Sequence, residues 1–196
     1  MEIYNQVFEN NAHWAALKTG ADPEYFQRLS VEQNPEFLYI GCSDSRVHPN
    51  NFLVLDPGHV FMYKNIANQV VPEELGIKSV VYFAAVHLNV KYIVVCGHYR
   101  CGGIKAALSE ESFGCMDPWL KRIKDVAHSH ESELVHIVDF NERWDKMVEW
   151  NVMEQCRQVE LLLDCADFNE LKIRPSVHGW VYDLKHGLLK DMKYPG

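Results

Sequence analysis

The clearest strand signal in the chain is the apolar segment Lys91-Tyr92-Ile93-Val94-Val95-Cys96-Gly97. Its odd and even positions are both apolar, which is the pattern of a parallel strand covered on its two faces. Two shorter apolar runs precede it, at residues 37–40 and 60–63. Residues 73–88, between the second run and this segment, are long and apolar enough for a crossover helix. The β-α-β pattern predicts neighbouring parallel strands.

The rest of the chain continues this alternation. Helices are expected at residues 102–108, 118–130 and 141–163, and a late strand at residues 176–184. We therefore predict an α/β fold, in which one domain has a mostly parallel central β-sheet flanked by helices. Residues 2–18 have helical apolar spacing, and Asp22-Pro23 resembles the start of a second short helix. The expected domain spans residues 1–196, with an N-terminal helical arm at 1–33 and an α/β core at 34–196.

Composition narrows the class of protein. The 196 residues include 19 Lys and Arg against 27 Asp and Glu, which gives a net charge of −8. An acidic chain repels phosphate backbones and anionic lipids, so nucleic acid and membranes are not expected partners. Apolar stretches such as residues 80–86 are far shorter than the roughly 20 residues of a membrane span. The first 18 residues lack the basic and apolar blocks of a secretion signal. We expect a cytoplasmic protein.

Six cysteines are the unusual feature of the composition. In an intracellular chain of this length they indicate a metal site or catalysis more than disulfides. Cys42 and Cys101 each follow a predicted strand and have polar neighbours. The other four, Cys96, Cys115, Cys156 and Cys165, lack such neighbours and are expected to be buried packing residues.

Polar segments follow two of the predicted strands, at residues 41–46 and 97–103. The carboxyl ends of parallel strands share one edge of the sheet, which is where open α/β sheets bind ligands. Cys42, His98 and Cys101 would supply two thiolates and one imidazole there. This set suits Zn²⁺ and leaves one tetrahedral position for water or substrate. The sequence therefore predicts a catalytic zinc site.

Asp44 and Arg46 lie just beyond Cys42. Two thiolates cancel the formal charge of the zinc ion, so the zinc-bound water is less acidic than at an all-histidine site. A further group is therefore expected to position this water or help to deprotonate it. In one alternative, Asp44 accepts a hydrogen bond from the zinc-bound hydroxide, and Arg46 holds the Asp44 carboxylate in a bidentate pair. In the other, Asp44 becomes a fourth zinc ligand and closes the site. Both alternatives stay open at this stage. The remaining histidines, including His48 and His59, are expected at the surface or in turns, and none is singled out as a proton shuttle.

These motifs together resemble the β-class carbonic anhydrases. The resemblance runs in order from about residue 33 to residue 192 and rests on Cys42-Ser43-Asp44-Ser45-Arg46, His98-x-x-Cys101-Gly102-Gly103, and the segments 64–68, 79–81, 151–155 and 177–182. It implies interconversion of CO₂ and bicarbonate through zinc-bound hydroxide, one zinc ion per subunit, and a homodimer or homotetramer.

By position, the resemblance implies particular roles. Cys42, His98 and Cys101 match zinc ligands, and Asp44 with Arg46 matches a catalytic pair. Gln33 matches a glutamine that contacts the substrate across the dimer interface, and Gly102 matches a position whose backbone amide lies near the substrate.

Two alternatives accompany this reading. One is a COS or CS₂ hydrolase that uses the same zinc site. The other is a non-catalytic, zinc-containing bicarbonate-binding protein, against which Asp44 and Arg46 argue. A subset of the family also has an inhibitory bicarbonate site made of Trp, Arg and Tyr. We match these to Tyr39, Lys64 and Phe83 and expect that bicarbonate inhibits weakly or not at all.

Overall fold

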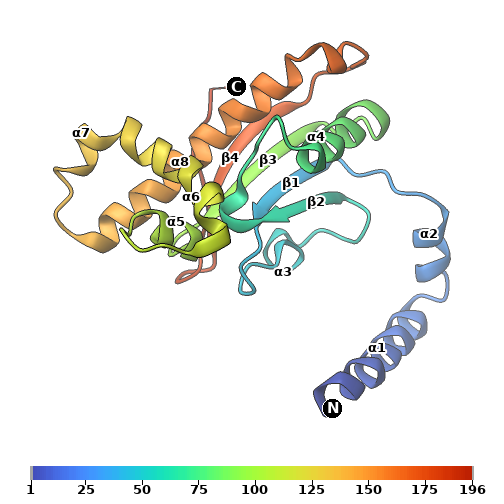
Figure 1. Ribbon diagram of the computed structural model, residues 1–196. Coiled ribbons are helices and arrows are strands. Elements are labelled where there is room, and N and C mark those ends of the chain that lie inside the picture. Colours follow the sequence, from blue (N-terminus) through green and yellow to red (C-terminus); the bar gives the residue numbers. More distant parts are fainter. Residues whose placement is uncertain (1, 196) are drawn as a thin grey trace. The chain divides into compact units, whose positions relative to one another are not determined.

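The computed structural model describes residues 2–195, so residues 1 and 196, the two ends of the predicted domain, lie outside it. The chain divides into two compact units, Met1–Asn34 and Pro35–Gly196 (Figure 1).

The first unit consists of two helices, α1 (Glu2–Ala21) and α2 (Tyr25–Val31). The second helix begins at Tyr25 and not at Pro23, because residues 22–25 form a turn in which the Tyr25 N–H donates to the Asp22 carbonyl at 3.1 Å. Several large apolar side chains of α1 are exposed, namely Ile3, Val7, Phe8 and Leu17.

The second unit is built on a five-stranded sheet with the order β2-β1-β3-β4-β5 (Figure 1). Its strands are β1 (Phe37–Cys42), β2 (Val60–Asn65), β3 (Tyr92–His98), β4 (Ser176–Asp183) and β5 (Leu188–Asp191). The first four are parallel, and β5 is antiparallel to β4. The predicted α/β fold with a mostly parallel sheet is confirmed. The short strand β5 was not predicted, because all four of its residues are exposed and it shows no burial pattern.

Helices lie on both faces of the sheet, and one face carries more of them than the other. The helices of this unit are α3 (Pro49–Leu53), α4 (Leu75–Tyr82), α5 (Gly102–Ala107), α6 (Asp117–Ser129), α7 (Glu131–Leu134) and α8 (Phe140–Leu163). Helix α4 continues into a π-helical turn at Phe83–His87, and 3₁₀ turns occur at Ile66–Asn68, Gly114–Met116 and Ala166–Phe168.

The core has a large and a small part. The large part joins one face of the sheet to α4, α5, α6 and α8, through residues such as Ile77, Ile104 and Val152. The small part, on the other face, consists of Tyr39, Val94 and Cys96, against which Phe52 and Leu53 of α3 pack. Both faces of β3 are therefore buried, as its sequence pattern predicts. Among residues 2–195, no helix has the length and apolar character that crossing a membrane requires.

The cysteine predictions are half correct. Cys96 and Cys156 are buried, whereas Cys115 and Cys165 are exposed. The packing prediction is wrong for the exposed pair because Cys115 lies in the 3₁₀ turn Gly114–Met116 and Cys165 follows the end of α8, and neither segment enters the core.

Candidate metal centre

Two neighbouring strands deliver the cysteine and histidine side chains to one point. β1 and β3 are parallel and adjacent, so Cys42 at the end of β1 and His98 at the end of β3 emerge at the same edge. Cys101 follows three residues after His98, immediately before α5. The ligand atoms of Cys42, His98 and Cys101 all lie within 4.8 Å of one another, and all three residues are buried.

The geometry of this group fits a zinc ion. The sulfur atoms of Cys42 and Cys101 are 3.8 Å apart. Two sulfurs that are each about 2.3 Å from a tetrahedral zinc ion would be about 3.8 Å apart. His98 Nδ1 lies 3.0 Å from the Tyr99 carbonyl oxygen, and since a carbonyl only accepts, Nδ1 carries the proton.

The other ring nitrogen, His98 Nε2, is buried and has no hydrogen-bond partner among the described residues. Buried polar atoms are nearly always paired, so an unpaired imidazole nitrogen beside two thiols indicates a metal ligand. The donor set and its spacing are therefore consistent with zinc.

The two thiols also influence each other. The hydrogen bond from Cys101 lowers the pKa of the Cys42 thiol despite burial, and His98 adds to the effect. The same contact, together with burial, raises the pKa of the Cys101 thiol. Cys42 therefore ionises readily and offers a negative sulfur to a cation.

Asp44 lies beside the three ligand atoms and is held by Arg46. Arg46 Nε donates to Oδ1 at 2.9 Å and Nη2 donates to Oδ2 at 2.7 Å, while the Arg46 backbone N–H donates to Oδ1 at 2.9 Å. These hydrogen bonds hold the pKa of the Asp44 carboxyl well below its usual range, although partial burial opposes them. Asp44 Oδ2 is 3.7 Å from His98 Nε2. Asp44 is thus paired with Arg46, and its two predicted roles at a zinc ion stay predictions.

A cavity of about 380 Å³ opens next to this cluster. Its polar side is formed by Cys42, Ser43, Asp44 and the glycines 102 and 103, and its apolar side by Ile66, Ala106, Phe113 and Met116. Gly103 permits the close approach of the apolar side, because a Cβ atom there would lie 2.7 Å from Ile66 Cγ2. The Asp44 carboxylate and these apolar side chains thus line one space. Ile66 lies in the recognised segment 64–68, but sequence reasoning missed Ala106, Phe113 and Met116, because these residues lie outside the recognised motifs.

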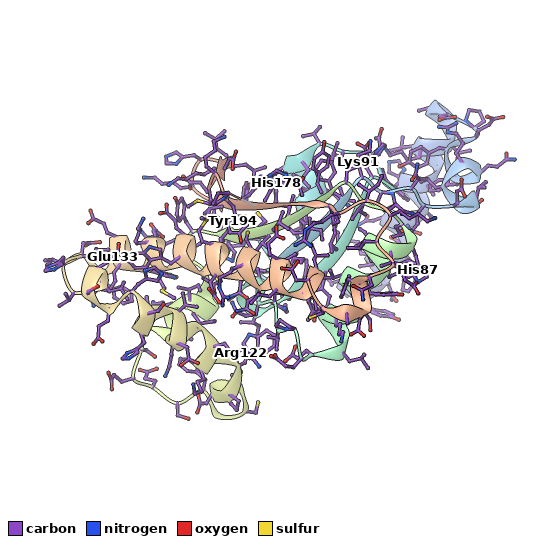
Figure 2. The ribbon with its side chains drawn as sticks, turned by 90° about the horizontal axis from the view of Figure 1, so that it is seen from above. His87, Lys91, Arg122, Glu133, His178 and Tyr194 are labelled. Carbon is purple, nitrogen blue, oxygen red and sulfur yellow. The ribbon has the colours of Figure 1, made fainter. Side chains whose placement is uncertain are left out.

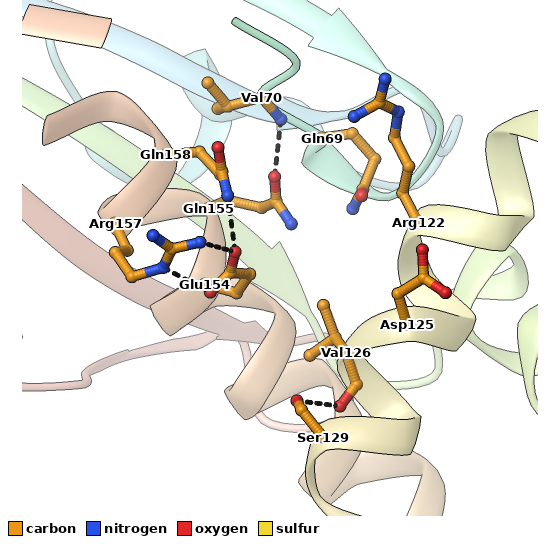
Figure 3. A pocket seen from close by; sticks show the side chains of 10 residues that line it. All are labelled: Gln69, Val70, Arg122, Asp125, Val126, Ser129, Glu154, Gln155, Arg157 and Gln158. Atoms are coloured by element: carbon orange, nitrogen blue, oxygen red, sulfur yellow. Dashed lines mark hydrogen bonds and ion pairs between the residues drawn. The ribbon is translucent and has the colours of Figure 1, made fainter. Parts of the chain in front are cut away.

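A second cavity, of about 330 Å³, is lined by residues of α6, of α8 and of the segment before α4 (Figure 3). Its charged and polar groups largely satisfy one another: Arg157 pairs with Glu154, and Gln155 accepts the Val70 backbone N–H at 2.8 Å. It contains none of the predicted site residues. The chemistry therefore belongs to the first cavity.

Comparison with known proteins agrees with this site. A family model described as carbonic anhydrase matches residues 37–189, a span that includes the cysteine and histidine cluster. A carbonic anhydrase from Emericella nidulans is 49% identical over 197 residues, which cover 100% of this chain and 86% of that protein. The chain belongs to the β-class carbonic anhydrase family.

Other members of the family are similar over nearly the same span. A carbonic anhydrase from Saccharomyces cerevisiae is 32% identical, with 95% of this chain and 87% of that protein covered. A solved structure of a tetrameric β-carbonic anhydrase from Sordaria macrospora has a TM-score of 0.90 and 35% identity, and 98% of each chain is covered. The shared fold thus includes the strand ends that carry the cluster.

The remaining sequence predictions have different outcomes. Gly102 lines the first cavity, as the first residue of α5. Gln33 is exposed and belongs to the first unit, so its contact with a substrate stays a prediction. His48 and His59 are exposed, as expected.

The weak or absent bicarbonate inhibition expected from Tyr39, Lys64 and Phe83 stays a prediction. Tyr39 is in the small core, whereas Phe83 is 41% exposed and packs on Phe61 at a ring distance of 5.8 Å. Lys64 Nζ donates to the Val47 carbonyl at 2.7 Å. Each of the three residues therefore has its own set of neighbours in the structure.

Proposed function

We propose that this carbonic anhydrase catalyses the reversible hydration of CO₂ to bicarbonate and a proton, with one zinc ion per subunit held by Cys42, His98 and Cys101. The observation that carries the proposal is the buried donor set, with its sulfur atoms 3.8 Å apart and an unpaired His98 Nε2. When bound, zinc supplies the Lewis acidity that makes water a nucleophile near neutral pH.

The protein groups position the reactants. The Asp44 carboxylate is ionised and can only accept hydrogen bonds. It therefore orients the attacking water by accepting a hydrogen bond from a water O–H group. Arg46 keeps both carboxylate oxygens in place through its bidentate pair. The apolar side of the cavity, with Ile66 and Phe113, receives CO₂ and excludes bulk water. The Gly102 backbone lines the same cavity and would face the substrate there.

The same proposal includes an assembly of two or four identical subunits, in which Gln33 of one chain contacts the substrate in its neighbour. The solved relative from Sordaria macrospora is described as tetrameric. The exposed apolar side chains of α1, such as Val7 and Phe8, are suited to burial against another chain. The two units of the chain then act together as one carbonic anhydrase domain.

Stopped-flow CO₂ hydration, with zinc content measured on the same samples, tests the reaction and the residue roles. The zinc-loaded protein is expected to accelerate CO₂ hydration. Cys42→Ser should lose zinc and activity together. Asp44→Asn should keep zinc and lose about 10²-fold or more of its rate, the effect typical of removing a proton acceptor. Cys165→Ser, at an exposed cysteine, is the matched control and should behave like the unmodified protein.

Two results would contradict the proposal. One is zinc-loaded protein without CO₂ hydration activity. The other is equal zinc retention in Cys42→Ser and Cys165→Ser.

A further inference from the structure

The loop between His98 and Cys101 has an unusual backbone. Arg100 has φ of 61°, in the left-handed region. Residues with a Cβ atom avoid this region for steric reasons, and glycine is the residue that adopts it freely. A side-chain-bearing residue stays there only when its surroundings hold it. Arg100 lies directly before Cys101, so its conformation influences the position of the Cys101 backbone, from which the sulfur extends.

The first turns of α8 supply those surroundings. Asp145 Oδ1 lies 3.4 Å from both the Arg100 backbone nitrogen and Arg100 Nε. Asn141 accepts a further hydrogen bond from the guanidinium group. The Arg100 guanidinium also lies over the Trp144 ring, 5.3 Å from its centroid. These side chains stand three and four residues apart and so share one face of the helix.

The same helix also contacts the residues on either side of Arg100. Trp144 Nε1 donates to the Cys101 carbonyl oxygen at 2.8 Å, and that oxygen also accepts the Lys105 backbone N–H at 3.0 Å. Tyr99 donates its hydroxyl to Glu149 at 2.7 Å. Three consecutive loop residues are thus held by one helix, which runs along the strands in Figure 2 and contacts β3 and β4.

We propose that Trp144 is a positioning residue for the metal, acting with the Arg100 contacts on α8 to hold the Cys101 sulfur at its distance from Cys42. The inference rests on the proposed zinc site and adds a determinant of its affinity that lies outside the ligands. Partners of metal ligands typically change metal affinity about 10–100-fold when removed. The contact is to a backbone carbonyl, so the N–H of Trp144 is the group that matters.

Trp144→Phe tests this, because it keeps an aromatic ring beside Arg100 and removes the N–H donor together with the five-membered ring of the indole. We expect zinc affinity, measured by competition with a chromophoric chelator, to fall about 10-fold or more. The thiolate-to-cobalt absorption band of the Co²⁺-loaded protein should shift, since the Cys101 sulfur moves. Trp150→Phe is the matched control: Trp150 is on the same helix but stacks on His130, 4.4 Å away, and its replacement should leave both measurements unchanged.

A second pair of variants tests the backbone conformation. Arg100→Ala loses the contacts with α8 but still has to adopt the left-handed conformation, whereas Arg100→Gly adopts it freely. We expect zinc affinity to fall in Arg100→Ala and to be several-fold higher in Arg100→Gly than in Arg100→Ala. Circular dichroism of the metal-free variants establishes that each is folded.

The outcomes separate the two proposals. Failure of the unmodified protein to bind zinc overturns the proposed function. Normal zinc binding by the unmodified protein, with equal affinities for the Trp144→Phe and Trp150→Phe variants or for the Arg100→Ala and Arg100→Gly variants, overturns the positioning role alone.

Discussion

The Glu149 side chain joins Tyr99, next to the ligand His98, to Lys190 of β5. Its carboxylate accepts from Tyr99 Oη at 2.7 Å, from Lys190 Nζ at 2.6 Å and from Lys146 Nζ at 3.2 Å. Its side chain is 12% exposed. Burial raises the pKa of this carboxyl, but the hydrogen bonds from Lys190, Tyr99 and Lys146 outweigh burial, and the pKa lies below its usual value.

A lowered pKa makes the contribution of Glu149 to stability pH-dependent. The ionised group stabilises the fold at pH values above its unfolded pKa of 4.5, and this contribution is lost as the pH falls through the lower folded value. Glu149→Gln should therefore reduce the free energy of unfolding at pH 7 by about 1–3 kcal/mol. The difference from the unmodified protein should shrink as the pH falls below 4.5.

Urea unfolding at several pH values measures this effect. Glu111→Gln, in an exposed loop, serves as the control and should change stability little at any pH. A Glu149→Gln difference that stays constant from pH 7 to acid pH would show that the carboxylate charge does not stabilise the fold.

At the scale of elements, the contact of α8 with the sheet depends on glycines. A Cβ atom at Gly97 of β3 would lie 2.6 Å from Val152 Cγ2 and 3.2 Å from Val148 Cγ1. At Gly179 of β4 it would lie 3.0 Å from Val152 Cγ1. Valine side chains cannot retreat inside a close-packed core. These glycines therefore let α8 lie close enough to the strands for its first turns to reach the ligand loop.

Gly97→Ala should force α8 and β3 apart and lower the free energy of unfolding by about 1–3 kcal/mol, the usual cost of overpacking. Gly76→Ala is the control, because its Cβ atom would be 3.6 Å from Tyr63 Oη, an ordinary contact, within helix α4. That change should stabilise the protein by about 0.5–1 kcal/mol. Denaturant unfolding of both variants checks the prediction, and equal stabilities would contradict the close packing of α8 on β3.

At the scale of the whole molecule, the proposed assembly predicts a particular mass. Light scattering of the unmodified protein should give two or four times the 22.7 kDa of the chain. Phe8→Asp places a charge on an exposed apolar part of α1 and should shift the mass towards that of the single chain, because a charge is costly to bury at an interface. Asn11→Asp, at an exposed polar position of the same helix, should leave the mass unchanged.

A mass of 22.7 kDa for the unmodified protein would contradict the proposed assembly. An unchanged mass for Phe8→Asp would contradict the role of α1 in it. In either case the metal centre within the second unit is tested separately, by zinc content.

The amino-acid sequence by itself determined the parallel strands and the position of Cys42, His98 and Cys101 at their ends, because apolar periodicity and motif spacing are properties of neighbouring residues. Phe37–Cys42 and Tyr92–His98 were recognisable as strands for this reason. Short elements such as β5 were not, since four exposed residues carry no periodic burial.

Tertiary structure decided the rest. It packed Phe52 and Leu53 of α3 against Tyr39, Val94 and Cys96 and brought Trp144 to the carbonyl of Cys101 across 43 positions of sequence. Contacts of this kind depend on which surfaces of distant elements meet when the core closes, and no local pattern of residues specifies them.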